Sequence, residues 1–234
     1  MKKSIIFCLA LAAFCLAAVS CQKTKPVTYP EPVVYTGDIE TSDVVDLGLS
    51  VDWASKNVGA ENPEDRGDYF TWGGILNKIT DVNISSYWDY DVETRAYVKY
   101  KTGGNVLDPE DDAATVNLGE NYRLPAPSEI DELLNKCIWL YAIYNGVKGY
   151  VVTSTINGKS IFLPCAGYCA EKGFVNFNAS GLYWTNISAS VQGNGSDLAA
   201  FAKALSLWPD RIDCADAHKY LSCPVRAVAE ITAP

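Results

Sequence analysis

The stretch Val45-Asp46-Leu47-Gly48-Leu49-Ser50-Val51-Asp52-Trp53 decides how this chain folds. Its odd-numbered positions are all apolar, and its even-numbered positions are polar residues or glycine, without exception over nine residues. Such alternation places one side of an extended chain in a core and the other side in water. The pattern therefore predicts a half-buried β-strand over residues 45–53.

Two helices are predicted after this strand. The segment Asp108-Pro109-Glu110-Asp111-Asp112-Ala113-Ala114 combines an N-cap residue, a proline at the first helical position and acids in the first turn. A second helix is expected to begin near Pro127, because apolar residues then recur at helical spacing and form one core-facing stripe. The members of this stripe are Ile130, Leu133, Leu134, Cys137, Ile138 and Tyr141.

The second half of the chain is predicted to be mostly β-sheet. Residues 150–156 and 159–163 flank Asn157-Gly158, the strongest short signal for a β-hairpin. Residues 199–207 suit a helix by their alanines and a strand by their alternation, and we favour the strand. Shorter strands are expected at residues 67–73, 174–177, 182–185 and 224–228. The predicted fold class is α+β, a single compact domain over residues 44–234 with two helices early and then mainly antiparallel strands.

The N-terminal residues 1–20 have the layout of a secretory signal peptide. A basic start at Lys2-Lys3 precedes an apolar run over residues 5–19 and small residues before Cys21. The run of about 15 apolar residues is shorter than the ~20 that a membrane-spanning helix needs. Residues 21–43 lack a sustained apolar period and contain Pro26, Pro30 and Pro32, so we expect an extended tether there.

The net charge of the chain argues against polyanionic partners. The chain has 28 acidic and 19 basic residues, and its net charge of −9 becomes −11 once Lys2 and Lys3 leave with the signal peptide. Such a surface does not attract nucleic acid or anionic lipid head groups. Contact with a membrane is therefore expected through acyl chains alone.

The cysteines that follow Cys21 are candidates for disulfides, because oxidising compartments favour them. They are Cys137, Cys165, Cys169, Cys214 and Cys223. An odd number leaves at least one thiol free or bridged to another chain, and the sequence does not choose among the possible pairings.

Several ordered motifs resemble those of a known family. The ending Ala18-Val19-Ser20-Cys21 resembles a bacterial lipobox, and the rest of the chain resembles Bacteroidetes lipoproteins with a Fibrobacter succinogenes major paralogous domain. The matching segments are residues 46–54, 57–60, 67–73 and 107–114, Tyr122-Arg123-Leu124-Pro125, residues 160–164, Tyr183-Trp184 and residues 225–228. More remotely, Arg123-Leu124-Pro125 before a helix and Tyr183-Trp184 are similar to C-type-lectin-like domains and to formylglycine-generating enzymes.

The resemblance implies a lipoprotein of the cell envelope with a C-type-lectin-like architecture and a lipid on Cys21. The alternative for Cys21 is an ordinary secretion signal with a chance cysteine. Outer-membrane attachment is implied, and the basic Gln22-Lys23-Thr24-Lys25 favours the periplasmic face over the cell surface, because exported surface lipoproteins of that phylum are often acidic there. The chain departs from the family at Ser55, where a cysteine is usual, and at Ala126, where a threonine would cap the helix.

Catalytic and metal-binding signals are weak. The sequence has no nucleophile elbow, zinc-protease motif, phosphate-binding loop or dinucleotide fingerprint. His218, the only histidine, would form a nucleophile pair with Cys214, but a solvated loop histidine explains it as well. Helix-start chemistry likewise explains a group of acids that would otherwise be weak candidates for Ca²⁺ ligands. These acids are Asp108, Glu110, Asp111 and Asp112; no other cofactor is expected.

The strongest site candidate is the aromatic group Tyr87-Trp88-Asp89-Tyr90, which falls in polar, loop-like sequence. Aromatic rings beside carboxylates suit carbohydrate, since rings stack on sugar faces and carboxylates bind hydroxyls. The alternative is that these rings fill the core, as we expect for Trp53, Trp72 and Trp184. The sequence thus favours a non-catalytic binding module for a glycan or another envelope protein. An enzyme of the formylglycine-generating or another thiol-using type and a structural subunit of a surface assembly are the alternatives.

Overall fold

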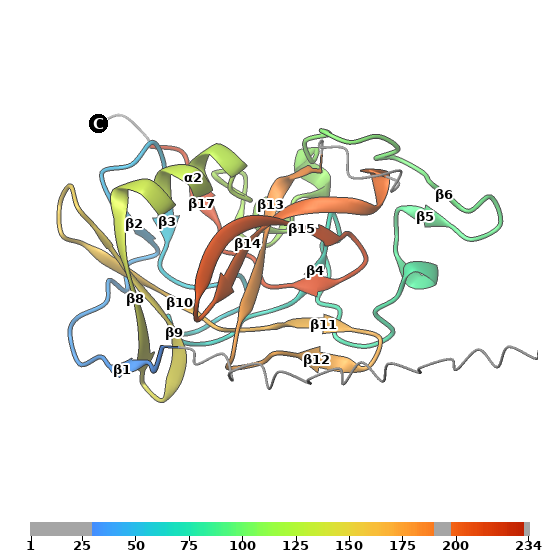
Figure 1. The fold of residues 1–234 in the computed structure, drawn as a ribbon. Helices are drawn as coiled ribbons and strands as arrows, with labels where there is room; N and C mark the ends of the chain where they lie inside the picture. The colour runs from blue at the N-terminus through green and yellow to red at the C-terminus, as the bar shows by residue number, and fades with distance from the viewer. Residues whose placement is uncertain (1–29, 190–197, 232–234) are drawn as a thin grey trace, which may run out of the picture.

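The computed structural model describes residues 30–189 and 198–231, and the described chain is mostly β-sheet with few helices (Figure 1). The α-helices are α1 (Ala113–Leu118) and α2 (Pro127–Lys136), and the 3-10 helices are η1 (Ile84–Ser86), η2 (Pro109–Asp111) and η3 (Leu198–Ala200). The strands are β1 (Val33–Val34), β2 (Val44–Val45), β3 (Asp52–Ala54), β4 (Phe70–Thr71), β5 (Tyr90–Asp91), β6 (Ala96–Tyr97), β7 (Tyr122–Arg123), β8 (Cys137–Tyr144), β9 (Val147–Ser154), β10 (Ser160–Pro164), β11 (Tyr168–Ala170), β12 (Gly173–Val175), β13 (Gly181–Ser188), β14 (Phe201–Trp208), β15 (Arg211–His218), β16 (Ser222–Cys223) and β17 (Val228–Ala229).

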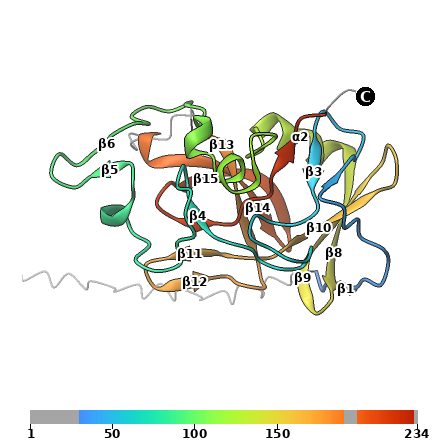
Figure 2. The same ribbon diagram turned by 180° about the vertical axis from the view of Figure 1, so that it is seen from behind.

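The strands form four larger sheets and one hairpin. Their orders are β1-β8-β9-β10, β12-β11-β16-β4, β13-β14-β15, β2-β3-β17-β7 and β5-β6. Every strand pair is antiparallel except β1 with β8, which is parallel. The few helices and the mainly antiparallel strands are consistent with the predicted α+β class. In Figures 1 and 2, the sheet of β8 lies at one end of the molecule and the β5-β6 hairpin at the other.

Residues 45–53 do not form the single strand that alternation predicted. β2 ends at Val45, β3 begins at Asp52, and the two pair antiparallel with Val45 opposite Trp53. The chain turns between them with Gly48 at a φ of 70°, a conformation that favours glycine. The burial pattern is nevertheless confirmed, because all five odd-numbered side chains are at most 5% exposed. Alternation reports which side of a chain is buried, and here it does so for a hairpin and its loop.

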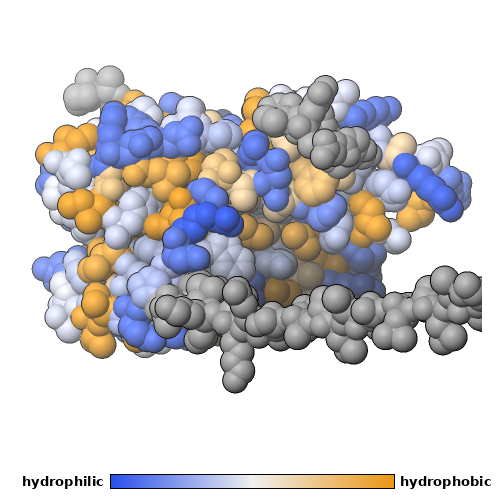
Figure 3. Space-filling model, in the orientation of Figure 1, coloured by the Kyte–Doolittle hydropathy of each residue, from blue (hydrophilic) through white to orange (hydrophobic). Residues whose placement is uncertain are grey.

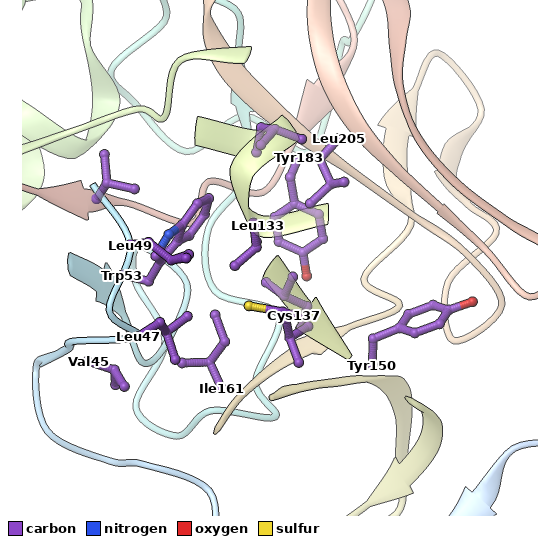
Figure 4. Close-up of a cluster of buried hydrophobic side chains, with 14 of the residues drawn as sticks. Val45, Leu47, Leu49, Trp53, Leu133, Cys137, Tyr150, Ile161, Tyr183 and Leu205 are labelled. Carbon is purple, nitrogen blue, oxygen red and sulfur yellow. The ribbon is translucent and has the colours of Figure 1, made fainter. Parts of the chain in front are cut away.

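The first hydrophobic cluster gathers around this hairpin (Figure 4). Leu47, Leu49 and Trp53 share this cluster with Leu133 of α2 and Ile161 of β10. A second cluster contains Trp72 and Trp184, and both tryptophans are at most 1% exposed. The prediction that Trp53, Trp72 and Trp184 belong to the core is therefore confirmed.

Both predicted helices needed correction. α2 begins at Pro127 as expected but ends at Lys136, and Cys137, Ile138 and Tyr141 lie in β8, which pairs with β9 along its full length. Over so few residues, the spacing of apolar side chains fits both a helix and a strand. Pairing with β9 makes residues 137–144 a strand. The helix start predicted at Asp108 is confirmed only as the short 3-10 helix η2, which has Asp108 as its N-cap and Pro109 as its first residue. The α-helix α1 begins after Asp112, whose carboxylate accepts hydrogen bonds from Ala114 N and Thr115 N at 2.9 and 3.1 Å.

The predicted strands were confirmed in part. The β9-β10 hairpin surrounds Asn157-Gly158, β14 is the strand favoured over residues 199–207, and β13 contains residues 182–185. The stretches 67–73, 174–177 and 224–228 are largely irregular and contribute only short pieces to β4, β12 and β17. β15 was missed because charged and apolar residues mix along it without a clean period.

The tether ends earlier than expected. Val33 and Val34 pair with Ala142 and Ile143 of β8, and Tyr35 N donates to Ile143 O at 2.9 Å. Ile39 is buried against Ala142 and Phe162. The folded domain therefore includes residues 33–43, and the boundary expected at residue 44 is too late. None of the described helices is long and apolar enough to span a membrane.

A buried guanidinium joins segments that are distant in sequence. Arg226 is 1% exposed and donates to Asn57 Oδ1 at 2.9 Å, Ser55 O at 3.0 Å, Ala54 O at 3.2 Å and Phe162 O at 2.9 Å. Burial lowers the pKa of Arg226 to about 10, so the group stays charged at neutral pH. Carbonyl dipoles surround this charge on the side of β3 and on the side of β10.

Replacing Arg226 with methionine is expected to lower the free energy of unfolding by about 3 kcal/mol or more, because each acceptor left without a donor costs about 1–3 kcal/mol and losing the desolvated charge offsets only part of that. Urea denaturation measures the change. The exposed Arg95→Met is the matched control and should stay within about 0.5 kcal/mol of wild type. Equal stabilities of the two variants would contradict the role given to Arg226.

Glu132 fastens the 46–51 loop to α2 and should make stability depend on acid pH. Its Oε2 accepts from Ser50 N and Oγ at 2.9 and 2.6 Å. Burial raises its pKa, but hydrogen bonds from Lys136 and Ser50 outweigh this and lower the pKa from 4.5 to about 2. The stabilisation is therefore complete above pH 4.5 and is lost as the pH falls toward 2. Unfolding free energies at pH 6, 4.5 and 3 should fall less steeply for Glu132→Gln than for wild type. The exposed Glu120→Gln should keep the wild-type slope.

Candidate ligand-binding site

The predicted aromatic group Tyr87-Trp88-Asp89-Tyr90 follows the short helix η1, and the structure separates its members. Tyr87 is 2% exposed, whereas Trp88 is 41% exposed. The Tyr87 hydroxyl and Trp88 Nε1 both donate to the carbonyl oxygen of Trp72, at 2.7 and 3.0 Å. One carbonyl thus fixes two neighbouring rings, one toward the core and one toward the surface.

Asp89 has a structural position. Its side chain is fully buried and accepts hydrogen bonds from Val98 N, Lys99 N and Tyr100 N at 3.2, 2.5 and 3.1 Å. It thereby holds residues 98–100 against the start of the β5-β6 hairpin. Tyr90 is half-buried, and its ring lies 5.4 Å from that of Tyr97. Of the four predicted residues, only Trp88 presents a substantial surface to a ligand.

Trp88 lies on the wall of a hollow of about 470 Å³ that the residues after β4 complete. We call it the Trp88 hollow; it is lined by Thr71, Gly73, Gly74, Ile75, Leu76, Asn77, Lys78, Ser86, Trp88 and Asp111. Its volume lies within the range of small-ligand sites, and a mainly apolar wall with a few polar groups is typical of such sites. Lys78 Nζ makes a long 3.4 Å hydrogen bond to Ser86 O, so this ammonium has donors left for a ligand.

Gly73 lets the indole of Trp88 come close to the main chain. Its φ is 73°, and a Cβ there would lie 2.6 Å from Cζ2 of Trp88. The sequence signal for this contact is Gly73-Gly74. Consecutive glycines mark turns and places where other groups can approach the main chain closely.

The weak calcium candidates surround a lysine. Lys99 Nζ forms ion pairs with Asp108 Oδ2 at 2.8 Å, Glu110 Oε1 at 3.2 Å and Asp111 Oδ2 at 2.6 Å. These hydrogen bonds raise the pKa of Lys99. The ammonium occupies the centre of the acidic group, where a cation would otherwise bind. Asp112 lies apart, as the α1 N-cap, and no group of three metal-ligating side chains occurs among the described residues.

The described cysteines are free thiols, so the expected disulfides are absent from the described structure. Cys137, Cys165, Cys169 and Cys223 are buried, and Cys214 is half-buried. Cys169 is opposite Ser222 in the β11-β16 ladder, so the side chain of the next residue, Cys223, points to the other face of the sheet. The cysteines are small hydrophobic side chains within the core.

Thiol chemistry finds little support in this arrangement. Burial raises the pKa of Cys137 and Cys169 to about 11 and that of Cys165 to about 12, whereas a thiol nucleophile needs a lowered pKa. Cys214 and His218 are four residues apart on β15, which separates them by roughly 13 Å. His218 is not in a solvated loop, since it ends β15 with its ring 4.2 Å from Phe201 and 5.1 Å from Tyr220. Burial lowers its pKa.

The chain was compared with known families, proteins and structures. No protein-family model, curated protein or solved structure matches this chain.

The contact between Gly73 and Trp88 can be measured through substitution. Gly73→Ala is expected to destabilise the protein more than Gly158→Ala, because both glycines have a φ near 75° but nothing lies within 4 Å of a Cβ at Gly158. Both variants carry the backbone strain of about 1–2 kcal/mol, and only Gly73→Ala also displaces a ring. Most of the excess should disappear in a Trp88→Ala background, where only Leu107 Cδ2, 3.2 Å from the added Cβ, remains close; a double-mutant cycle by urea denaturation would measure this. An excess of undiminished size without Trp88 would refute the contact.

Proposed function

We propose that this chain is a lipid-anchored binding module of the cell envelope that holds a glycan in the Trp88 hollow. The observation that carries the proposal is Trp88 itself, an exposed indole fixed by a hydrogen bond at the edge of a hollow of about 470 Å³. A ring held in place before binding loses little conformational freedom when a ligand stacks on it. Lys78 beside it offers hydrogen-bond donors to hydroxyls.

The cellular setting of the proposal rests on the resemblance to Bacteroidetes lipoproteins. Cys21, which lies outside the described residues, would carry the lipid at the outer membrane, with the periplasmic face favoured. The acidic net charge of −9 agrees with attachment through acyl chains, not through basic side chains. The C-type-lectin-like architecture is part of the same proposal, and the α+β class agrees with it.

A glycan array tests this function with wild type, Trp88→Ala and Phe174→Ala. Phe174 is a matched control, because its ring is 45% exposed and it does not line the Trp88 hollow. Wild type and Phe174→Ala should bind the same glycans. Trp88→Ala should bind at least about tenfold more weakly, a loss of about 1.4 kcal/mol of stacking.

Two results would count against the proposal. Binding that is the same in all three proteins would place the ligand elsewhere. The absence of binding to every glycan, together with a stable complex with another copy or another envelope protein, would favour the structural-subunit alternative.

A further inference from the structure

The outer edge of β8 is only partly covered. β8 runs over eight residues, but its neighbour β1 pairs only with Ala142 and Ile143. Within the described chain, no strand lies beside β8 from Cys137 to Tyr141 on that side. Exposed strand edges of this kind are templates for pairing with another chain.

Backbone direction identifies the groups that are open at this edge. The carbonyl of Ile143 accepts from Tyr35 N and therefore points away from β9. Because successive residues of a strand point their N–H and C=O groups to alternate sides, those of Tyr141 and Trp139 point the same way. Beyond the end of β1, the edge thus offers the N–H and C=O of Trp139 and the N–H of Tyr141.

Apolar side chains border the open edge on both faces. On one face, Ile138 and Leu140 are 63% and 39% exposed. On the other, Trp139 and Tyr141 line a hollow of about 530 Å³ whose floor is Tyr150, with ring centroids 5.8 and 5.3 Å from that floor. The Tyr150 hydroxyl donates to Trp208 O at 2.6 Å, which holds the β14-β15 turn at the far side. Figure 3 shows hydrophobic surface at the lower left, in the region where Figure 1 labels β1 and β8.

The described entry segment does not complete the pairing. Continuing the β1 register places Pro32 opposite Tyr141 and Pro30 opposite Trp139, so the residue whose main-chain groups would face β8 between them is Glu31. Among the described residues, no main-chain hydrogen bond joins Glu31 to Trp139 or Tyr141. Pro30 lines the hollow together with Trp139 and Tyr141. β1 shows that the edge accepts an extended chain, and the described entry segment leaves the next groups of this edge unpaired.

We propose that the β8 edge binds an extended peptide of another protein by strand addition, with one of its apolar side chains in the Trp139-Tyr141-Tyr150 hollow. Main-chain hydrogen bonds would supply affinity, and the hollow would select the side chain. A sugar would fill the hollow but leave the main-chain groups of Trp139 unused. Asp210 and Arg211 both line this hollow, and their opposite charges favour neither an acidic nor a basic peptide. The apolar side chain of the peptide therefore decides which peptide binds. The site is separate from the Trp88 hollow and does not depend on the glycan function.

The probe is a phage-displayed library of random seven-residue peptides, selected on the full protein, with the best peptide then synthesised. Tyr141→Ala removes the ring, and Tyr141→Pro removes the ring and the outward N–H without touching the β8-β9 ladder. We expect Tyr141→Ala to weaken binding about tenfold and Tyr141→Pro to weaken it about tenfold again. Tyr141→Phe and Trp88→Ala should bind like wild type. Trp139→Ala should weaken peptide binding at least about tenfold. This variant keeps the test valid if Tyr141→Pro does not fold.

Amide hydrogen exchange supplies the second readout, because bound peptide should slow exchange at residues 137–141. The proposal is overturned if selection enriches no peptide, or if Tyr141→Ala and Tyr141→Pro bind equally well. It is also overturned if these amides are already protected in the free protein, which would mean that residues 22–29 or a second copy occupies the edge. A glycan array without hits would not affect these outcomes, so the two proposals fail separately.

Discussion

The buried guanidinium of Arg226 is the contact on which the arrangement of the sheets depends. It lies just before β17, yet its acceptors belong to the end of β3, to the chain that follows β3 and to β10, and β3 and β10 are in different sheets. Asn57 extends the network, since its Nδ2 donates to Arg66 O at 2.9 Å and contacts the Tyr183 hydroxyl at 3.4 Å. Tyr183 in turn donates to Pro164 O at 2.6 Å, which adds the sheet of β13. One buried charge therefore organises polar groups from three sheets.

Such side-chain links matter because much of the backbone pairing is short. β4, β7, β16 and β17 are each two residues long and form few ladder bonds. Buried aromatic side chains compensate for the missing ladder bonds, because they donate hydrogen bonds to main-chain carbonyls that are far away in the sequence. Trp72 Nε1 bonds to Thr185 O at 2.9 Å, and Trp184 Nε1 bonds to Phe70 O at 2.7 Å, so the two tryptophans join β4 and β13 reciprocally. Trp53 differs, because its buried Nε1 has no hydrogen-bond partner in the described structure.

What could be predicted from the sequence is the part that local physics decides. Alternation around Leu47 and Leu49 identified the buried side, Asn157-Gly158 identified a hairpin, and Pro127 marked the start of α2. The errors occurred where a distant partner decides. β9 makes Cys137–Tyr144 a strand, and Leu124 N, bonded to Asp112 at 2.8 Å, helps select Asp112 from a run of acids as the N-cap.

The same distinction explains the site. The sequence placed Tyr87, Trp88, Asp89 and Tyr90 together as candidates, but the carbonyl of Trp72 and the amides of residues 98–100 decide which of them face solvent. The entry segment is a further example. Its prolines predict an extended tether, but Val33 and Val34 pair with β8, a partner that lies more than 100 residues away in the sequence. The chain thus enters its domain beside β8, whereas the β5-β6 hairpin, which begins two residues after Trp88, lies at the opposite end (Figures 1 and 2). In the proposed lipid-anchored module, the chain that follows Cys21 would therefore reach the domain at its β8 end.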